Sequence, residues 1–284
     1  MKNLIQSFFL IWFGALHSQQ LGNFIPTNYE ISLKKECDFN SDKQKDYILI
    51  LSNKKENERP LISTDNNISK RMLLILKKNN NNKYEKVFES NEIVPCRECS
   101  GKSDNLYSDI SFNNYILKFS TTNYPFDGNR YFTSTYSLKY EDNKFYLEKY
   151  EEKFYENAED DNPLKVNLSN SDFEKRPFDF YLFNFGNNTW ENQIIVNNKN
   201  VAYLNNIAFY YLQKNQNNIA EILLEKILQN FPERVVAWLN LADLQWKLEE
   251  REKAKTFYEK YISLMKSQGK DLNKIPLRVY ERIK

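Results

Sequence analysis

The chain carries two hydrophobic periodicities, one after the other. From about Tyr29 to Tyr155, hydrophobic and polar residues alternate in short runs rich in Ile, Leu, Phe, Tyr and Thr, such as "DYILILSNK" at 46–54. Alternation with a period of two is typical of strands with one buried face. Polar turn residues such as "EDN" at 141–143 separate the runs. We therefore predict an antiparallel β meander of seven strands over residues 25–156, with one face exposed to solvent.

The pattern weakens between residues 157 and 200. The stretch "ENAEDDNPLKVNLSNSD" at 156–172 is polar and has no clear period, so we predict a linker or docking segment over 157–200. Within it, "RPFDFYLFNF" at 176–185 brings five aromatic residues into ten positions. An exposed aromatic run of that density is unusual. We interpret it as the interface where the two halves of the chain pack, with a ligand-binding groove as the alternative.

From Val201 onward the period becomes 3.6 residues, which is typical of amphipathic helices. The pattern also repeats, because a shift of 34 residues aligns six small or hydrophobic positions. The aligned pairs are Leu204 with Trp238, Ile207 with Leu241, Ala208 with Ala242, Ala220 with Ala254, Leu224 with Tyr258, and Ile227 with Tyr261. Matches at a single offset predict two copies of one structural unit.

The two copies resemble the tetratricopeptide repeat, a helical hairpin with a 34-residue period. The residues that carry the likeness are Leu204, Ile207, Ala208, Ala220, Leu224 and Pro232 in the first copy, and Trp238, Leu241, Ala242, Ala254 and Tyr258 in the second. The sequence departs from the family at Ile227 and Tyr261, where a small residue is usual, and at Lys266, where a second proline is expected.

The resemblance covers about residues 201–266 and implies two stacked hairpins. Two hairpins leave a hydrophobic face bare at each end of the stack. The chain offers two caps for these faces: the tail "IPLRVYERIK" at 275–284, which we expect to form a short helix beginning at Pro276, and the aromatic run before Val201. The helical part is therefore assigned to residues 201–284.

The resemblance also implies a surface that binds another protein. In the family, one face of the first helix of each hairpin lines a concave groove that can hold an extended peptide. The residues at those positions here are Asn205, Asn206, Phe209, Asn240, Asp243 and Trp246. The set of lysines and arginines that clamps a carboxylate in some members is missing from these positions.

A second candidate site is the stretch "CDFNSDKQKDYILIL" at 37–51. Oxygen-bearing side chains follow the spacing that calcium loops use. Counted from Asp38 as position 1, the candidate ligands are Asp38, Asn40, Asp42, Gln44 and Asp46. A helix–loop–helix calcium site is excluded, because position 12 is Leu49 rather than a glutamate and the flanking residues are typical of strands.

The stretch resembles instead the DxDxDGxxD loops between strands of FG-GAP-like β-repeats of the integrin type. That resemblance implies a structural Ca²⁺ ion. The sequence departs from the pattern at Lys43, where the family has glycine, and Lys45 adds a further positive charge. The alternative is a turn held by hydrogen bonds from Asp and Asn side chains to the backbone.

A third candidate is the pair Cys96 and Cys99 in "PCRECSG". In an exported protein such a pair can be a local disulfide, a redox pair or half of a zinc site. Redox chemistry needs a helix N-terminus to lower the thiol pKa, whereas these residues lie among strands. We therefore expect a structural disulfide or thiols in a tight loop, with Cys37 unpaired unless it takes one of them.

The N-terminus predicts export. "MKNLIQSFFLIWFGALHSQQ" has one lysine, a hydrophobic run and then small and polar residues, the pattern of a signal peptide over residues 1–18 with cleavage after Ser18 or Gln19. The run is shorter than the roughly 20 residues that span a bilayer. We expect no transmembrane segment after cleavage and a periplasmic or secreted location, with a bacterial source indicated by the composition rich in Lys, Asn, Ile and Tyr.

Composition narrows the chemistry that this chain can perform. Loss of residues 1–18 removes Lys2 and the single histidine, His17, and leaves 39 Lys+Arg against 38 Asp+Glu. That balance gives no electrostatic argument for binding nucleic acid. Without histidine, the Ser/His/Asp and Cys/His nucleophile systems and histidine zinc sites are excluded.

These observations predict an α+β protein with an N-terminal antiparallel β domain followed by a short array of tetratricopeptide repeats. The function that they favour is a non-enzymatic, exported protein of the cell envelope that binds or scaffolds another protein and carries a structural calcium loop. Two alternatives remain: a carboxylate-dependent or metal-dependent hydrolase, and an envelope protein that binds a small ligand.

Overall fold

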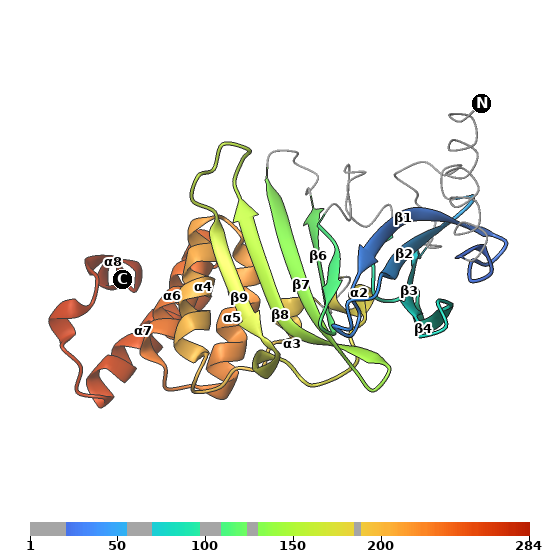
Figure 1. Cartoon of the computed structure of the whole chain (residues 1–284). Coiled ribbons are helices and arrows are strands. Elements are labelled where there is room, and N and C mark those ends of the chain that lie inside the picture. Colours follow the sequence, from blue (N-terminus) through green and yellow to red (C-terminus); the bar gives the residue numbers. More distant parts are fainter. Residues whose placement is uncertain (1–20, 56–69, 97–108, 124–129, 185–188) are drawn as a thin grey trace, which may run out of the picture. The chain divides into compact units, whose positions relative to one another are not determined.

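The computed structural model describes residues 21–55, 70–96, 109–123, 130–184 and 189–284. The chain forms two compact units (Figure 1). Unit 1 comprises Met1–Asn170 and Lys175–Asn184, and unit 2 comprises Ser171–Glu174 and Phe185–Lys284. Strands dominate the first unit and helices dominate the second, which confirms the predicted α+β class. The predicted signal peptide lies outside the described residues. None of the described helices combines the length and hydrophobicity that crossing a membrane requires.

The first sheet of unit 1 is a four-stranded antiparallel meander in the order β1-β2-β3-β4. Its strands are β1 (Tyr29–Cys37), β2 (Asp46–Asn53), β3 (Met72–Lys78) and β4 (Tyr84–Ser90). The register places Asp46, the first residue of β2, opposite Cys37, the last residue of β1. The acidic loop predicted from the sequence is therefore the connection between these two strands.

The central strands of this sheet are buried on both faces. Residues 46–52 of β2 and 73–76 of β3 are all buried. On one face Leu49 and Leu74 belong to a cluster that also contains Leu21, near the start of the described chain. The prediction of one solvent-exposed face is wrong for these strands. Their runs "ILIL" and "LLIL" are continuous rather than alternating, and continuous hydrophobic runs are typical of strands covered on both sides.

The second sheet is a five-stranded antiparallel meander in the order β5-β6-β7-β8-β9. Its strands are β5 (Ser111–Asn113), β6 (Ile116–Asn123), β7 (Tyr131–Glu141), β8 (Lys144–Tyr155) and β9 (Leu164–Ser169). The described residues thus contain nine strands where the sequence predicted seven. β9 lies in the segment that was predicted as a linker, and its residues "LKVNLS" alternate strictly between buried and exposed.

An aromatic cluster joins the two sheets within unit 1. Phe39 lies just after β1, with its ring centroid 5.0 Å from that of Phe112 in β5 and 5.3 Å from that of Tyr140 in β7. Phe88 of β4 meets Phe145 of β8 at 4.8 Å. Aromatic pairs at these separations add packing energy beyond the area that they bury. The loop after β1 is thereby fixed where the two sheets meet.

The aromatic run at 176–185 packs on the second sheet. The run includes the short helix α2 (Phe180–Asn184). Phe178, Phe180 and Phe183 are 7%, 3% and 5% exposed, and their ring centroids lie 5.6–6.0 Å from that of Tyr136 in β7. The rings of these three residues are therefore core side chains of unit 1.

Unit 2 consists of two long helical hairpins with short helices before and after them. Its helices are α3 (Trp190–Gln193), α4 (Val201–Gln213), α5 (Asn217–Asn230), α6 (Val235–Lys247), α7 (Arg251–Ser267) and α8 (Leu277–Arg282). Helix α4 packs on α5, α5 on α6, and α6 on α7. The four alanines that align in the two copies, Ala208, Ala220, Ala242 and Ala254, are all 0% exposed. Alanine has no side chain beyond Cβ, so the helices of a hairpin can approach closely at these positions.

Short helices cover the hydrophobic ends of this array. At the C-terminal end, α8 begins after Pro276, and Ile275 and Val279 belong to the core cluster of the second hairpin. At the other end, α3 packs on α5, and Trp190 of α3 is 4% exposed with its ring 6.4 Å from Tyr211 of α4. Within unit 2 the first hairpin is therefore capped by α3.

Candidate functional sites

The acidic loop after β1 is organised by hydrogen bonds from its own backbone. The two carboxylate oxygens of Asp38 accept hydrogen bonds from the backbone N–H groups of Asp42 and Lys43, each at 3.0 Å. Asp42 Oδ1 accepts from the backbone N–H of Gln44 at 2.8 Å. Such contacts are those expected for the turn alternative. Carboxylate oxygens each have two lone pairs, so these bonds leave acceptor capacity on both aspartates.

Asp46 holds the base of the loop. Its side chain is fully buried, and its two oxygens accept hydrogen bonds from the backbone N–H groups of Phe39 and Lys78, both at 2.8 Å. Burial raises the pKa of Asp46 because it disfavours the charged form; the two N–H donors oppose that shift. The neighbouring carboxylates of Asp42 and Asp38 raise the pKa further. The fold therefore concentrates negative charge here at a cost that a cation would relieve.

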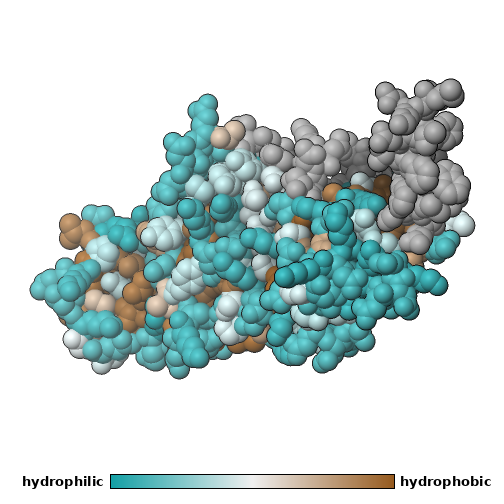
Figure 2. Space-filling view, viewed as in Figure 1, coloured by the Kyte–Doolittle hydropathy of each residue, from teal (hydrophilic) through white to brown (hydrophobic). Residues whose placement is uncertain are grey.

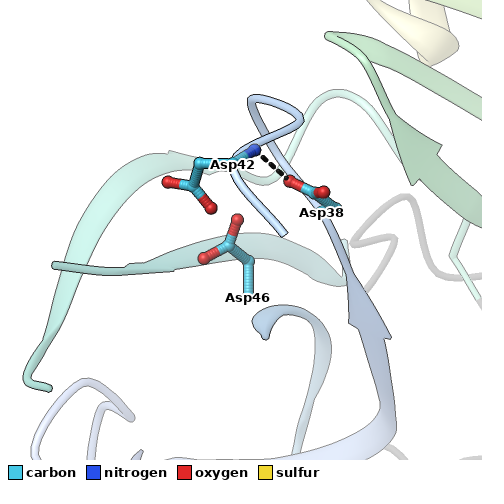
Figure 3. Close-up of side chains that lie close together, drawn as sticks. All are labelled: Asp38, Asp42 and Asp46. Carbon is cyan, nitrogen blue, oxygen red and sulfur yellow. Dashed lines mark hydrogen bonds between the residues drawn. The ribbon is translucent and has the colours of Figure 1, made fainter. Parts of the chain in front are cut away.

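The geometry of the three aspartates fits a calcium ion. Figure 3 shows the side chains of Asp38, Asp42 and Asp46 gathered around one space. One oxygen from each lies within 4.8 Å of the others. Ligand oxygens at 2.3–2.6 Å from Ca²⁺ are at most about 5 Å apart, so one ion can reach all three. These three are the only group of that kind among the residues that the structure describes. The alternative hypothesis of a metal-dependent hydrolase would therefore place its metal ion at the same three aspartates.

The loop around the three aspartates also contains Asn40, Lys43, Gln44 and Lys45. Asn40 Oδ1 is buried and accepts no hydrogen bond from the described part of the chain. Lys43 has a φ of +64°, a conformation that glycine adopts more readily than a residue with a Cβ atom. Lys45 Nζ lies 3.0 Å from Glu36 Oε2, so its charge is paired outside the three aspartates. Gln44 contributes a backbone donor to the turn.

The cysteines provide no reactive thiol in the described residues. Cys96 is buried and disulfide-bonded, which agrees with a structural role. Cys99 lies outside the described residues. Cys37 is a free cysteine beside the acidic loop, where burial, followed by the negative charges of Asp46 and Asp38, raises its pKa to about 12. A thiol with such a pKa carries almost no thiolate at neutral pH, so Cys37 is a poor nucleophile.

The predicted partner-binding residues of the repeats lie at different depths. On α4, Asn206 and Phe209 are exposed, with Phe209 at 39%, whereas Asn205 is 2% exposed. On α6, Asn240 is 5% exposed. The amide atoms Asn205 Oδ1 and Asn240 Nδ2 are buried without a hydrogen-bond partner in the described structure. The surface accessible to a partner on α4 therefore centres on Phe209 and its neighbour Tyr210, which is 52% exposed.

Asp243 and Trp246 on α6 contact arginines, and these contacts were not predicted from the sequence. Arg278 of α8 donates from Nε and Nη2 to the two carboxylate oxygens of Asp243, at 3.0 and 2.7 Å. Arg282 Nη1 donates to Asp243 Oδ1 at 2.8 Å. The guanidinium of Arg282 lies 4.8 Å from the centroid of the Trp246 ring. The only signal in the sequence is the pair of arginines four residues apart in the tail, which places both on one face of a helix.

A buried polar pair in the second sheet was also missed. The Tyr150 hydroxyl donates to Glu152 Oε2 at 2.6 Å and lies 3.1 Å from Ser134 Oγ. Burial and the Glu152 charge raise the pKa of Tyr150 well above its usual value. Tyr150, Glu152 and Phe154 occupy alternate positions of β8 and are all buried. A glutamate at an inward position of a period-two strand was the signal that could have found this pair.

Comparison with known proteins supports the repeat assignment. The family model of the tetratricopeptide repeat matches residues 235–266, which correspond to the second hairpin. No curated protein and no solved structure matches the chain. A tetratricopeptide repeat supports a role in protein–protein interaction. The likeness of the acidic loop to loops of FG-GAP-like repeats stays a prediction.

Proposed function

We propose that this protein is exported to the cell envelope, where it binds another protein through the face of α4 and α6 that carries Phe209 and Trp246. The observation that carries the proposal is the adjacent pair Phe209 and Tyr210 on α4. Both rings are exposed, and their centroids lie 5.8 Å apart. Two neighbouring exposed aromatic side chains are unusual on a free surface and are enriched where proteins bind.

Site-specific cross-linking in the native host tests this proposal. A photo-reactive phenylalanine analogue at position 209 is expected to yield a discrete cross-linked product that mass spectrometry can identify. The matched control places the same analogue at Glu85, an exposed residue of β4. With the analogue kept at position 209, Tyr210→Ala should weaken the product without lowering the melting temperature, because the Tyr210 side chain is exposed. A product that forms equally from position 85, or no product at all, would contradict the proposal.

Export is the second part of the proposal and has its own test. The first residue of the described chain, Leu21, is 3% exposed and packs in the core of the first sheet. A mature chain that begins at Gln19 or Gln20 retains this contact. N-terminal sequencing of the protein recovered from the native host should find one of these two glutamines at the N-terminus. Recovery of a chain that still begins at Met1 would contradict export with cleavage.

A structural calcium ion in the acidic loop is a further proposal. It is supported by the spacing of the oxygens of Asp38, Asp42 and Asp46 and by the buried Oδ1 of Asn40 without a partner. If calcium binds only the folded state, it raises stability by about 2.7 kcal/mol at a concentration 100 times its dissociation constant. Thermal melting with calcium and with chelator measures this effect. The loop is only a turn if calcium leaves the melting temperature unchanged in the natural chain and in Asp42→Ala alike.

A further inference from the structure

The end of the repeat array carries a marked excess of positive charge. Residues 251–284, which include α7 and α8, hold ten Lys+Arg and four Asp+Glu, a net charge of +6. The other 250 residues hold 30 Lys+Arg and 34 Asp+Glu, a net charge of −4. The near-zero charge of the whole chain therefore conceals a basic C-terminal segment. Such an asymmetry favours partners of opposite charge and accelerates their association.

Two arginines of this segment lie against the ring of Trp246, and a third contacts Asp243 on the same helix. The guanidinium of Arg251 lies 3.9 Å from the centroid of the indole ring, and that of Arg282 lies 4.8 Å from it. Arg251 Nη1 also donates to the backbone carbonyl of Trp246 at 2.6 Å. Arg278 joins the group through its two bonds to Asp243. Among the described residues, Asp243 is the one carboxylate bound by arginines of this group, so positive charge is in excess there.

The arginines keep donors that their own contacts do not use. A guanidinium has five N–H donors. Asp243 engages Nε and Nη2 of Arg278 and Nη1 of Arg282, while it also accepts from the Tyr258 hydroxyl at 2.7 Å. The Arg278 side chain remains 42% exposed, and Arg251 is exposed as well. Asp243 thus orients the arginines rather than neutralising them, and oriented guanidiniums lose little entropy when they bind a carboxylate.

Trp246 links this arginine cluster to the predicted binding face of the repeats. It was predicted as a partner-binding residue and is half-buried on α6. Figure 2 shows hydrophobic residues among the hydrophilic ones at the C-terminal helices. A segment that offers carboxylates beside hydrophobic side chains matches both the arginines and the indole ring. Carboxylates are recognised by the guanidinium fork with two parallel hydrogen bonds.

We propose that the arginine cluster, consisting of Arg251, Arg278 and Arg282, binds an acidic segment of the protein partner. This inference rests on the proposed function and specifies the chemistry of the partner. The tail helix α8 then has two roles: Val279 caps the hydrophobic core, and Arg278 and Arg282 extend the binding face with positive charge. The positively charged residues that the family positions lack are supplied by α8 and by the start of α7.

Fluorescence anisotropy with a labelled peptide of alternating glutamate and leucine tests this inference on the full mature chain. The peptide should bind, and raising the salt concentration should weaken binding because exposed charges are screened. The double variant Arg251→Gln, Arg278→Gln should lose affinity by about tenfold or more, as charged hydrogen bonds are lost. The double variant Lys260→Gln, Lys266→Gln removes the same charge from exposed positions of α7 and should change affinity by less than about twofold.

A charge-reversal variant and two competing ligands test whether binding of the peptide depends on the arginine cluster. Arg251→Glu alone reverses one charge of the cluster and should therefore abolish peptide binding. It leaves every bond to Asp243 intact, so the protein should still melt at its normal temperature. No binding of the peptide, or equal losses in the arginine and lysine variants, would overturn the inference. Tighter binding of double-stranded DNA or phosphatidylserine vesicles through the same arginines would also overturn it. If the Phe209 cross-link persists in the arginine variants, the proposed function stands and this inference fails.

Discussion

At the scale of single residues, the backbone of the acidic loop is strained at Lys43. Lys43 adopts a φ of +64°, a conformation that costs a residue with a Cβ atom about 1–2 kcal/mol. Lys43→Gly removes that strain but adds chain entropy to the unfolded state. We expect a net gain in unfolding free energy of up to about 1 kcal/mol. Chemical denaturation measures it, and Lys86→Gly in β4, a regular strand, should instead lower stability.

Asp46 is the residue on which the loop depends most. Its two oxygens satisfy two backbone N–H groups, those of Phe39 and Lys78. Asp46→Asn can satisfy only one of them, because its amide nitrogen cannot accept a hydrogen bond. We expect a loss of about 1–3 kcal/mol in unfolding free energy, the cost of one unsatisfied buried donor. Asp42→Asn, on the exposed side of the loop, should cost less. Equal losses in the two variants would contradict this account.

The raised pKa of Asp46 predicts how the proposed binding of calcium depends on pH. In the absence of a cation, a carboxyl whose pKa is raised by folding contributes stability at low pH, which is lost as pH rises through the folded pKa. A bound cation requires the ionised form, so it acts in the opposite direction. The gain in melting temperature from calcium should therefore disappear as pH falls, at a pH above the ordinary pKa of aspartate, near 3.9. A gain that persists below that value would contradict the assignment of Asp46 as a ligand.

At the scale of elements, α8 illustrates a short helix that depends on its packing. Six residues are too few for a stable isolated helix. Val279 is 0% exposed and anchors α8 in the core of the second hairpin, whereas Leu277 is 79% exposed. We expect Val279→Ala to lower the unfolding free energy by about 1–3 kcal/mol, and Leu277→Ala to leave it within about 0.5 kcal/mol. Denaturant titration followed by circular dichroism measures both.

The strands show which elements the sequence pattern can define. The long runs that became β1–β4 and β6–β8 were predicted, because their hydrophobic residues are many and their turns are marked. β5 has three residues, too few for a pattern. β9 alternates strictly between buried and exposed residues. The polar residues on either side of it hide this short alternation when the whole stretch 156–172 is considered together. Its pairing with β8, which buries Val166 opposite Glu152, fixes it as an edge strand of the second sheet.

At the scale of the whole molecule, the two units are not consecutive in sequence. Residues 171–174 belong to unit 2, although residues 175–184 return to unit 1. Two hydrogen bonds hold the segment 171–174 in unit 2. Asn200 Nδ2 donates to Asp172 Oδ1 at 2.9 Å, and the backbone N–H of Ile195 donates to the Asp172 carbonyl at 2.8 Å. A fragment of residues 171–284 should therefore fold and melt cooperatively as a helical protein. A fragment of residues 189–284 lacks both bonds and should melt at a lower temperature, which circular dichroism can show.

The sequence by itself determined the α+β class, the two helical hairpins, the terminal cap and the acidic loop. Local patterns specify these features: hydrophobic period, alanines at a fixed offset, a proline before a helix, and oxygen side chains at fixed spacing. The tertiary structure alone decided that Asp46 is fully buried, that Phe39 joins two sheets, and that Arg278 and Arg282 reach Asp243. These depend on contacts between residues distant in sequence, 35 positions for Arg278 and Asp243, and no local period records which distant side chains meet.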